Sequence, residues 1–458
     1  MQTKAVVVLD VGKTLAKLSL WSQGRLLDRR TRPNARCVSS AGYPCLDTKG
    51  IEAWLAEGLA DFARQAPIGA IMPVAHGAGA VLIAPDGSYL EPLDYEAALP
   101  EALAESYAAQ RPDFAETGSP SLPCGLNLGA QLHWLEAVAP QRFAVGTIVT
   151  WAQFWAWRLS GVAAVEVSSL GVHTDLWNPA AAAPSSLAVA RGWAKRFAPL
   201  RRAGEALGGV SEEWRQRAHL SADCLVYCGL HDSNADLLAA RTHPRVKGGE
   251  LTVVSTGTWF ISMRAGANAI ALPPGRDCLY NSDVFGRAVP SVRFMGGRET
   301  ELLEETQPQL DTAINAKALL ARAETLISEG VMALPTFQPG VGPFPDQLGR
   351  WIDRPLDQLG RRAATGLYLA MMLDCCLDLI GAREAVVIGG RFQSDPVFTQ
   401  MLAALRPRNA IYLAPSGDSL CLGALSLIGP VPDSELLKVE PLARETAAYK
   451  ARWSELLS

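Results

Sequence analysis

The stretch with the clearest potential for chemistry is YCGLHDSNADLLAA, residues Tyr227–Ala240. A short apolar segment comes first, and an apolar-rich helix is expected from about Ser233, so His231 and Asp232 lie where a strand ends and a helix begins. Side chains at such a junction reach a cleft, and free backbone N–H groups there can bind anions. A helix N-terminus merely capped by Asp232 or Ser233 is the alternative.

A second candidate follows the valine-rich run Ala5–Leu9, which predicts a buried strand. The run leads into DVGKT, residues 10–14, and Lys17–Trp21 predicts the returning strand. In this turn a glycine lets the backbone approach an anion, Thr14 donates hydrogen bonds, and Asp10 could hold Mg²⁺ through water. An ordinary hairpin is the alternative, and the spacing of a P-loop is absent.

The same pattern of strand, hydroxyl–glycine turn and strand recurs at Leu251–Met263, with the turn STGT at residues 255–258. Two halves that begin alike predict a duplicated fold in which two turns hold a nucleotide's phosphates between them. Thr242–Gly249 combines proline, glycine and charge without periodicity. It therefore predicts a boundary between an N-terminal domain, residues 1–243, and a C-terminal domain, residues 247–458.

Two more predicted strands end in glycines. The strand at 70–75 leads into His76 and Gly77, which suit contact with a polar small molecule, although a lone histidine is more often structural. The strand at 385–388 leads into a Gly-Gly pair and then a helix from about Asp395, as beside a bound nucleotide. The three spaced glycines of a dinucleotide site are missing, which argues against a dehydrogenase.

Composition excludes several classes of protein. The 458 residues are 49% hydrophobic and 19% charged, with a net charge of −4 and no basic tail, which argues against nucleic acid and anionic membranes as partners. No apolar run approaches the roughly 18 residues of a membrane span. The nine cysteines are scattered and the six histidines dispersed, which predicts reduced thiols, a cytoplasmic protein and no histidine-built metal site.

Periodicity places the other elements. Ile51–Gln65 and Gln358–Leu379 predict helices. Leu93–Pro123 is polar and weakly periodic, which predicts an excursion over the surface. Glu166–Trp177 predicts a loop, either one that binds a sugar through its aromatic and polar groups or a packed surface loop.

With these pieces placed, the chain resembles the FGGY carbohydrate kinases, and among them the branch of rhamnulokinase- and fuculokinase-like enzymes. Four stretches carry the resemblance, in order and over nearly the whole chain: VVVLDVGKT at Val6–Thr14, GLHDSNAD at Gly229–Asp236, STGTW at Ser255–Trp259 and IGGRFQSDP at Ile388–Pro396. Each is modest alone, whereas four in the right order are specific.

The resemblance implies an α/β protein of two duplicated ribonuclease H-like domains, of the actin/hexokinase type, around a central cleft that closes on substrate. It implies a kinase that uses ATP and Mg²⁺ to phosphorylate a ketose or deoxyketose of the L-rhamnulose or L-fuculose type. The small-molecule sugar is the expected partner, without nucleic acid or membrane, and a homodimer is left open.

The resemblance also implies roles for single residues. Asp232 would be the general base, and Asp10 would hold the magnesium of Mg-ATP. The other residues expected at the nucleotide are Gly12, Lys13, Thr14, Gly257, Thr258, Gly297, Gly389, Gly390 and Ser394. Those expected at the sugar are His76, Gly77 and His231.

Two departures from the family's pattern stand out. Lys13 occupies a position that usually holds serine or threonine, where it can supply charge to the phosphates. Thr150–Gly161 lacks the acid that many members carry in a region that touches substrate in glycerol and xylulose kinases. A non-catalytic sugar or nucleotide sensor and an ATP- or polyphosphate-hydrolysing relative are the alternatives. Loss of Asp10 or Asp232 would have indicated the sensor, and both are present.

Overall fold

The structure is a computed structural model that describes residues 4–246, 248–266, 268, 270–305, 315–415, 417–432 and 435–457. The chain divides into two compact units. The first unit contains Met1–Ala239, Tyr280–Ala288 and Asp418–Pro432, and the second contains Ala240–Leu279, Val289–Gly417 and Asp433–Ser458. Two later segments therefore return to the first unit. The sequence predicts two continuous domains, residues 1–243 and 247–458, and this assignment of domains stays a prediction.

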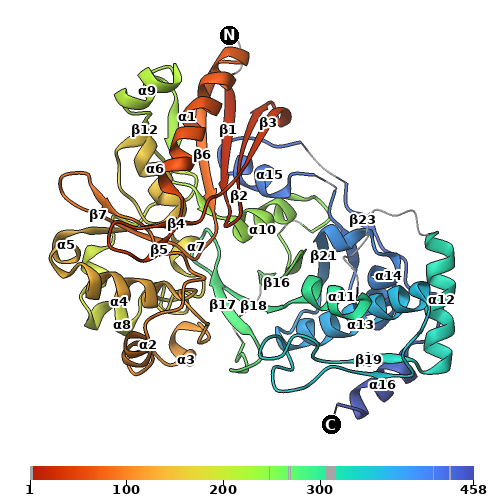
Figure 1. The fold of residues 1–458 in the computed structure, drawn as a ribbon. Helices are drawn as coiled ribbons and strands as arrows, with labels where there is room; N and C mark the ends of the chain where they lie inside the picture. The colour runs from red at the N-terminus through yellow and green to blue at the C-terminus, as the bar shows by residue number, and fades with distance from the viewer. Residues whose placement is uncertain are drawn as a thin grey trace. The chain divides into compact units, whose positions relative to one another are not determined.

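The first unit is built on a mixed sheet in the strand order β12-β13-β6-β1-β2-β3, with the short β14 also on β6 (Figure 1). Strands β1, β2 and β3 form an antiparallel meander, β6 and β13 are parallel to β1, and β12 is antiparallel to β13. The strand bounds are β1 Ala5–Val11, β2 Leu15–Ser22, β3 Arg25–Pro33, β6 Ile68–Ala75, β12 Ala206–Gly209, β13 Leu225–Tyr227 and β14 Leu230–His231.

The second unit repeats this topology in the strand order β18-β16-β15-β21-β22-β23, and β17, of which only Cys278 and Leu279 are counted with the second unit, extends the sheet beside β18. Strands β15, β16 and β18 form the antiparallel meander, β21 and β22 are parallel to β15, and β23 is antiparallel to β22. The bounds are β15 Leu251–Thr256, β16 Phe260–Ala265, β17 Cys278–Ser282, β18 Ala288–Phe294, β21 Ala385–Gly390, β22 Ile411–Leu413 and β23 Leu437–Lys438. The predicted duplicated α/β fold is confirmed.

Side chains that alternate along β1 explain the layers of the first unit. Val7 and Leu9 belong to a core with the helices α1 (Thr48–Gln65), α6 (Trp151–Ser160) and α9 (Glu212–Ala218). Val8 belongs to a separate core with α10 (Asp232–Thr242) and α15 (Ser419–Ser426). The sheet of the first unit is therefore covered on both faces, and α10 carries Asp232 at its first position.

Most residues of the predicted surface excursion at 93–123 are exposed or half-buried, but the segment has more structure than predicted. It contains α2 (Glu101–Ala108) and α3 (Phe114–Thr117), and Leu93 and Tyr107 are buried in a second core of the first unit. The Tyr107 hydroxyl donates to Asp175 at 2.6 Å. The predicted loop at 166–177 likewise contains α7 (Val167–Leu170). Long-range contacts order both segments, and local periodicity does not report them.

The large helices of the second unit are α11 (Gly296–Glu304), α12 (Ala316–Glu329), α13 (Gln358–Leu379) and α14 (Pro396–Leu405). The bounds of α13 agree with the predicted ones. No helix of the described chain is both long enough and apolar enough to cross a membrane. All nine cysteines are free.

The remaining elements are short. In chain order they are β4 Cys37–Val38, β5 Pro44–Cys45, β7 Ala80–Ile83, β8 Tyr89–Leu90, α4 Leu128–Val138, α5 Pro140–Val145, β9 Thr147–Thr150, β10 Trp177–Asn178, β11 Ala183–Pro184, α8 Ser186–Ala190, η1 Trp193–Arg196, β19 Met332–Leu334, β20 Arg350–Ile352, η2 Arg391–Ser394 and α16 Ala447–Glu455.

Candidate active site

Asp232 and His231 lie where the sequence predicts, at the junction of β14 and α10. His231 pairs with Ala75 at the end of β6, so the sheet fixes its backbone. The chain bends just before this point at Gly229, which has a φ of 81°. A Cβ there would lie 2.2 Å from the carbonyl oxygen of Pro73, so only glycine fits.

His231 is hydrogen-bonded to the Asp232 carboxylate. Its Nε2 lies 3.1 Å from Asp232 Oδ1, and its Nδ1 lies 3.3 Å from Asn234 Nδ2. Because an amide nitrogen only donates, Nδ1 accepts, and Nε2 carries the proton that is donated to Asp232. Burial lowers the pKa of His231 to about 4, so the imidazole is neutral near neutral pH. His231 therefore orients Asp232 as well as being a predicted sugar contact.

Within the described chain, only one of the two carboxylate oxygens of Asp232, Oδ1, accepts hydrogen bonds. Oδ1 also accepts hydrogen bonds from the backbone N–H of Ser233 at 2.6 Å and from its hydroxyl at 3.2 Å. Oδ2 accepts none from the described residues and is left for a ligand. Burial raises the pKa of Asp232 to about 6, with the bonds from Ser233 and the charge of Lys17 opposing. Such a carboxylate is a stronger base than an exposed one.

Residues that sequence reasoning missed hold this segment. Buried Gln153 donates through Nε2 to the carbonyl oxygens of Cys228, at 3.1 Å, and Gly229, at 3.0 Å. The backbone N–H of His231 donates to Ser168 Oγ at 3.2 Å, and Ser168 Oγ donates to the fully buried Glu166 at 2.6 Å. No local sequence signal indicates the contacts of Gln153 and Ser168 with this segment, because these partners lie more than 60 residues apart.

Asp10 is nearly buried at the end of β1 and faces Lys17 across the hairpin. Lys17 Nζ lies 3.1 Å from Asp10 Oδ2. Burial raises the pKa of Asp10; Lys17 opposes the shift and the charge of Asp232 adds to it. The two carboxylates therefore share one electrostatic environment. Sequence reasoning missed Lys17, which the register of β1 and β2 places opposite Asp10.

The turn between β1 and β2 is fastened by Asn34. Its side-chain amide donates to the carbonyl oxygens of Gly12 at 2.9 Å and Lys13 at 3.2 Å, and its backbone N–H donates to Thr14 at 2.8 Å. Thr14 is exposed at the tip. The Lys13 ammonium is paired with Asp94 and Glu96. Its predicted contact with phosphates, which stays a prediction, would require this pair to open.

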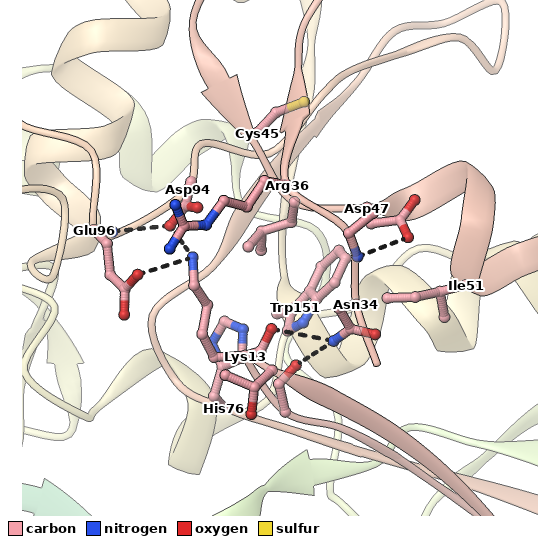
Figure 2. A pocket seen from close by; sticks show the side chains of 14 residues that line it. Lys13, Asn34, Arg36, Cys45, Asp47, Ile51, His76, Asp94, Glu96 and Trp151 are labelled. Carbon is pink, nitrogen blue, oxygen red and sulfur yellow. Dashed lines mark hydrogen bonds and ion pairs between the residues drawn. The ribbon is translucent and has the colours of Figure 1, made fainter. Parts of the chain in front are cut away.

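A pocket of about 130 Å³ lies beside this turn (Figure 2). Its walls include Lys13, Asn34, Asp94, His76 and Trp151. Both ring nitrogens of His76 are buried, and they have no hydrogen-bond partner in the described chain. Burial lowers the pKa of His76 to about 3, and the charge of Lys13 adds to the shift. The neutral imidazole can therefore bind one hydroxyl as donor and another as acceptor.

Gly77 lies between His76 and His231. A Cβ on Gly77 would lie 2.4 Å from Val172 Cγ1 and 3.1 Å from two atoms of the His231 ring. The three predicted sugar-contacting residues, His76, Gly77 and His231, are therefore neighbours in the first unit.

The second unit brings the predicted nucleotide residues of three segments together. The backbone N–H of Gly297, in the first turn of α11, donates to the carbonyl oxygen of Thr258 at 3.1 Å. A Cβ on Gly297 would lie 2.2 Å from the carbonyl oxygen of Gly257 and 2.9 Å from Thr258 Cα. Gly297 is therefore required for the close approach of α11 to the turn between β15 and β16.

Gly389 and Gly390 end β21, in register with Ser255 and Thr256 of β15. The Thr256 hydroxyl donates to the carbonyl oxygen of Gly389 at 2.6 Å. The helix predicted from about Asp395 is confirmed as α14, which begins at Pro396 with Asp395 as its N-cap, and the short helix η2 lies between it and the glycines. Ser394 closes η2, and its exposed hydroxyl donates to Arg391 at 3.0 Å.

Comparison with known proteins places the chain in a family. Residues 248–435 match the family described as carbohydrate kinase FGGY, C-terminal domain. A search of the curated proteins gives no match. Among solved structures, a carbohydrate kinase from Novosphingobium aromaticivorans is 45% identical with a TM-score of 0.95, and the match covers 100% of this chain and 99% of that chain.

More distant structures share the fold alone. Glycerol kinase from Plasmodium falciparum is 11% identical with a TM-score of 0.80, and the match covers 99% of this chain and 98% of that one. Gluconate kinase from Lactobacillus acidophilus is 15% identical with a TM-score of 0.76, covering 99% and 97%. On the matched domain and the 45% identical relative, this chain belongs to the FGGY family of carbohydrate kinases, which are ATP-dependent phosphotransferases.

Proposed function

We propose that this kinase transfers the γ-phosphoryl group of Mg-ATP to a hydroxyl of a ketose or deoxyketose, with L-rhamnulose and L-fuculose as lead substrates and Asp232 as general base. The observation that supports it most is the state of Asp232: Oδ1 is held by His231 and Ser233, while Oδ2 accepts no hydrogen bond within the described chain. We also propose that the protein is cytoplasmic. Both a monomer and a homodimer are compatible with this function.

In the proposed mechanism the sugar hydroxyl would give its proton to Asp232 Oδ2 as its oxygen bonds to the γ-phosphorus of ATP. The bond from that phosphorus to the oxygen bridging to the β-phosphate would break, and ADP would leave. His231 keeps the carboxylate in place through Nε2–H, and His76 and Gly77 line the sugar. Phosphoryl transfer requires mainly positioning and charge stabilisation, so an oriented base accounts for roughly a 10²–10⁴-fold part of the rate.

The residues present fit the proposed cofactor. The described chain holds no group of three or more histidine, cysteine, aspartate or glutamate side chains that could bind a metal ion. Mg²⁺ in kinases commonly uses one or two carboxylates together with phosphate oxygens and water, for which Asp10 is suited. When bound, Mg-ATP supplies the phosphoryl group and neutralises its charge. Around it, Gly12, Thr14, Gly257 and Thr258 would meet phosphates, and Gly297, Gly389, Gly390 and Ser394 the adenosine.

The test is ATP consumption with Mg²⁺ against a panel of ketoses, deoxyketoses and polyols, with a control without sugar. The panel includes xylulose, gluconate and glycerol, since structural neighbours are named for these substrates. We expect sugar-dependent turnover, highest with a ketose or deoxyketose. Binding of ATP without turnover on any sugar would contradict the proposal and favour the sensor, whereas turnover that ignores sugar would favour the hydrolase.

The pH dependence should report Asp232. Because burial raises its pKa to about 6, the fraction of carboxylate falls as the pH drops through this value. We expect kcat/KM to fall about tenfold per pH unit below about pH 6 and to be flat above it. Asp236 has a pKa raised to about 6 by burial as well, so Asp236→Asn is the control that should leave the break in place. A profile flat down to about pH 4.5 would argue against Asp232 as the base.

The variant Gly297→Ala tests whether Gly297 belongs to the proposed nucleotide-binding site. The new Cβ would press on the backbone of Gly257 and Thr258, so we expect a KM for ATP raised about tenfold and a KM for sugar within about twofold. Gly249→Ala is the matched control in the same unit, since its Cβ would meet only one atom, at 3.8 Å. An unchanged KM for ATP would remove Gly297 from the proposed nucleotide site.

A further inference from the structure

Lys13 leaves the turn between β1 and β2 and reaches the segment Asp94–Glu96 (Figure 2). Its ammonium pairs with Asp94 Oδ1, lies 3.7 Å from Glu96 Oε2 and sits 4.9 Å from the centre of the Tyr95 ring. The side chains of Lys13 and Asp94 are only 18% and 16% exposed. The cation is thus surrounded by one short segment far away in sequence.

Asp94 connects Lys13 to the backbone of this segment. The same Oδ1 accepts the N–H of Glu96 at 2.9 Å, and the backbone N–H of Asp94 donates to the carbonyl oxygen of Pro44 at 2.9 Å. One carboxylate oxygen therefore shapes the turn at 94–96 and holds the ammonium. Loss of Lys13 would leave the mostly buried Asp94 carboxylate uncompensated, which is costly, and loss of the Asp94 charge would leave Lys13 with the more distant, exposed Glu96 as partner.

Tyr95, in the middle of the segment, faces the proposed sugar side. Its ring lies edge-on to His76, with the ring centres 5.1 Å apart and the planes at 74°. Burial raises the pKa of the Tyr95 hydroxyl, and the negative charges of Glu96 and Asp232 add to the shift. Tyr95 therefore stays protonated and lies within electrostatic reach of the proposed base.

We propose that Lys13 is a positioning residue for the sugar side of the active site: through Asp94 it fixes the segment 94–96 and so holds Tyr95 against His76. The inference rests on the proposed function. It assigns Lys13 an effect on sugar binding, in contrast to the contact with ATP phosphates that its place in the first motif suggests. The ammonium and its two carboxylates together carry a net negative charge, which disfavours the approach of a further anion such as a phosphate.

The test compares Lys13→Met, Asp94→Asn and the double variant on the best sugar. We expect each single change to raise the KM for sugar about tenfold, and the double variant to be no worse than either, because the two residues act as one unit. The KM for ATP should stay within about twofold in all three. Lys13→Arg, which keeps the ion pair, should restore most of the sugar affinity. Lys49→Met, the loss of an exposed cation on α1, is the matched control.

Two outcomes would contradict the proposed role of Lys13. A raised KM for ATP or a kcat lowered tenfold or more in Lys13→Met, with Asp94→Asn close to wild type, would show that Lys13 serves the phosphates and would overturn this inference alone. Wild-type protein without sugar-dependent turnover would overturn the proposed function and the inference with it. Should Lys13→Met fail to fold, the double variant and Lys13→Arg still give the comparison, since neither leaves a mostly buried charge unpaired.

Discussion

Replacing Asp232 with asparagine is expected to lower kcat at least about a hundredfold, because an amide has the shape of the carboxylate but cannot accept the proton. The KM values for sugar and ATP should change little. An amide oxygen in the place of Oδ1 can still accept the hydrogen bonds from His231 and Ser233, so the segment keeps its geometry.

Initial rates at saturating sugar and ATP measure this effect, with melting temperature as the check on folding. Asp223→Asn is the matched control, since the Asp223 side chain is 78% exposed and, among the described residues, its charge pairs only with Lys4, at 3.4 Å. Turnover within a few-fold of wild type in Asp232→Asn would rule out Asp232 as the base and shift attention to Asp10.

Glu166→Gln is expected to stabilise the protein more as the pH rises. Glu166 is fully buried, and one of its oxygens, Oε1, has no hydrogen-bond partner in the described chain. Burial raises its pKa from the ordinary 4.5 to about 7, with the bonds from Ser168 and Ser169 opposing. Between these values the unfolded chain loses a proton that the folded chain keeps, so the wild type loses unfolding free energy as the pH rises.

Glutamine does not titrate, so the advantage of Glu166→Gln should grow by about 2 kcal/mol between about pH 5.5 and about pH 8. Urea unfolding at both pH values, followed by tryptophan fluorescence, measures the change. Glu57→Gln, the loss of an exposed carboxylate on α1, is the control and should show no such trend. A difference that stays constant or shrinks with pH would mean that Glu166 is already ionised in the folded protein.

Local pattern was enough for the frame of the fold. The apolar runs ending at Leu9 and Val254 predict the two hairpins, and their similarity predicts the duplication that the two sheets confirm. The strand-to-helix junction at His231 and Asp232 was predictable for the same reason, since a short apolar run and a helical period meet there. Where periodicity is weak, as in the segment that contains α2 and α3, the helices were not predicted.

The contacts that shape the site were not predictable, because they join residues far apart in sequence. Gln153 reaches the carbonyl oxygens of Cys228 and Gly229, Glu166 acts through Ser168 on His231, and Lys13 pairs with Asp94. Each is a single polar side chain in an apolar or mixed stretch, with no periodic signal. Thr150–Gly161, which lacks the acid common in the family, instead supplies Gln153 to hold the proposed catalytic segment.

The proposed reaction is transfer of the γ-phosphoryl group from ATP to a sugar hydroxyl, with Asp232 as the general base. Incubation of ATP labelled in the γ-phosphoryl group with Mg²⁺ and the best sugar of the panel, followed by separation of sugar phosphate from inorganic phosphate, tests it most directly. We predict that the wild type puts the label on the sugar and that Asp232→Asn does so at least about a hundredfold more slowly. Labelled inorganic phosphate released at the same rate with and without sugar, and no labelled sugar phosphate, would contradict this function.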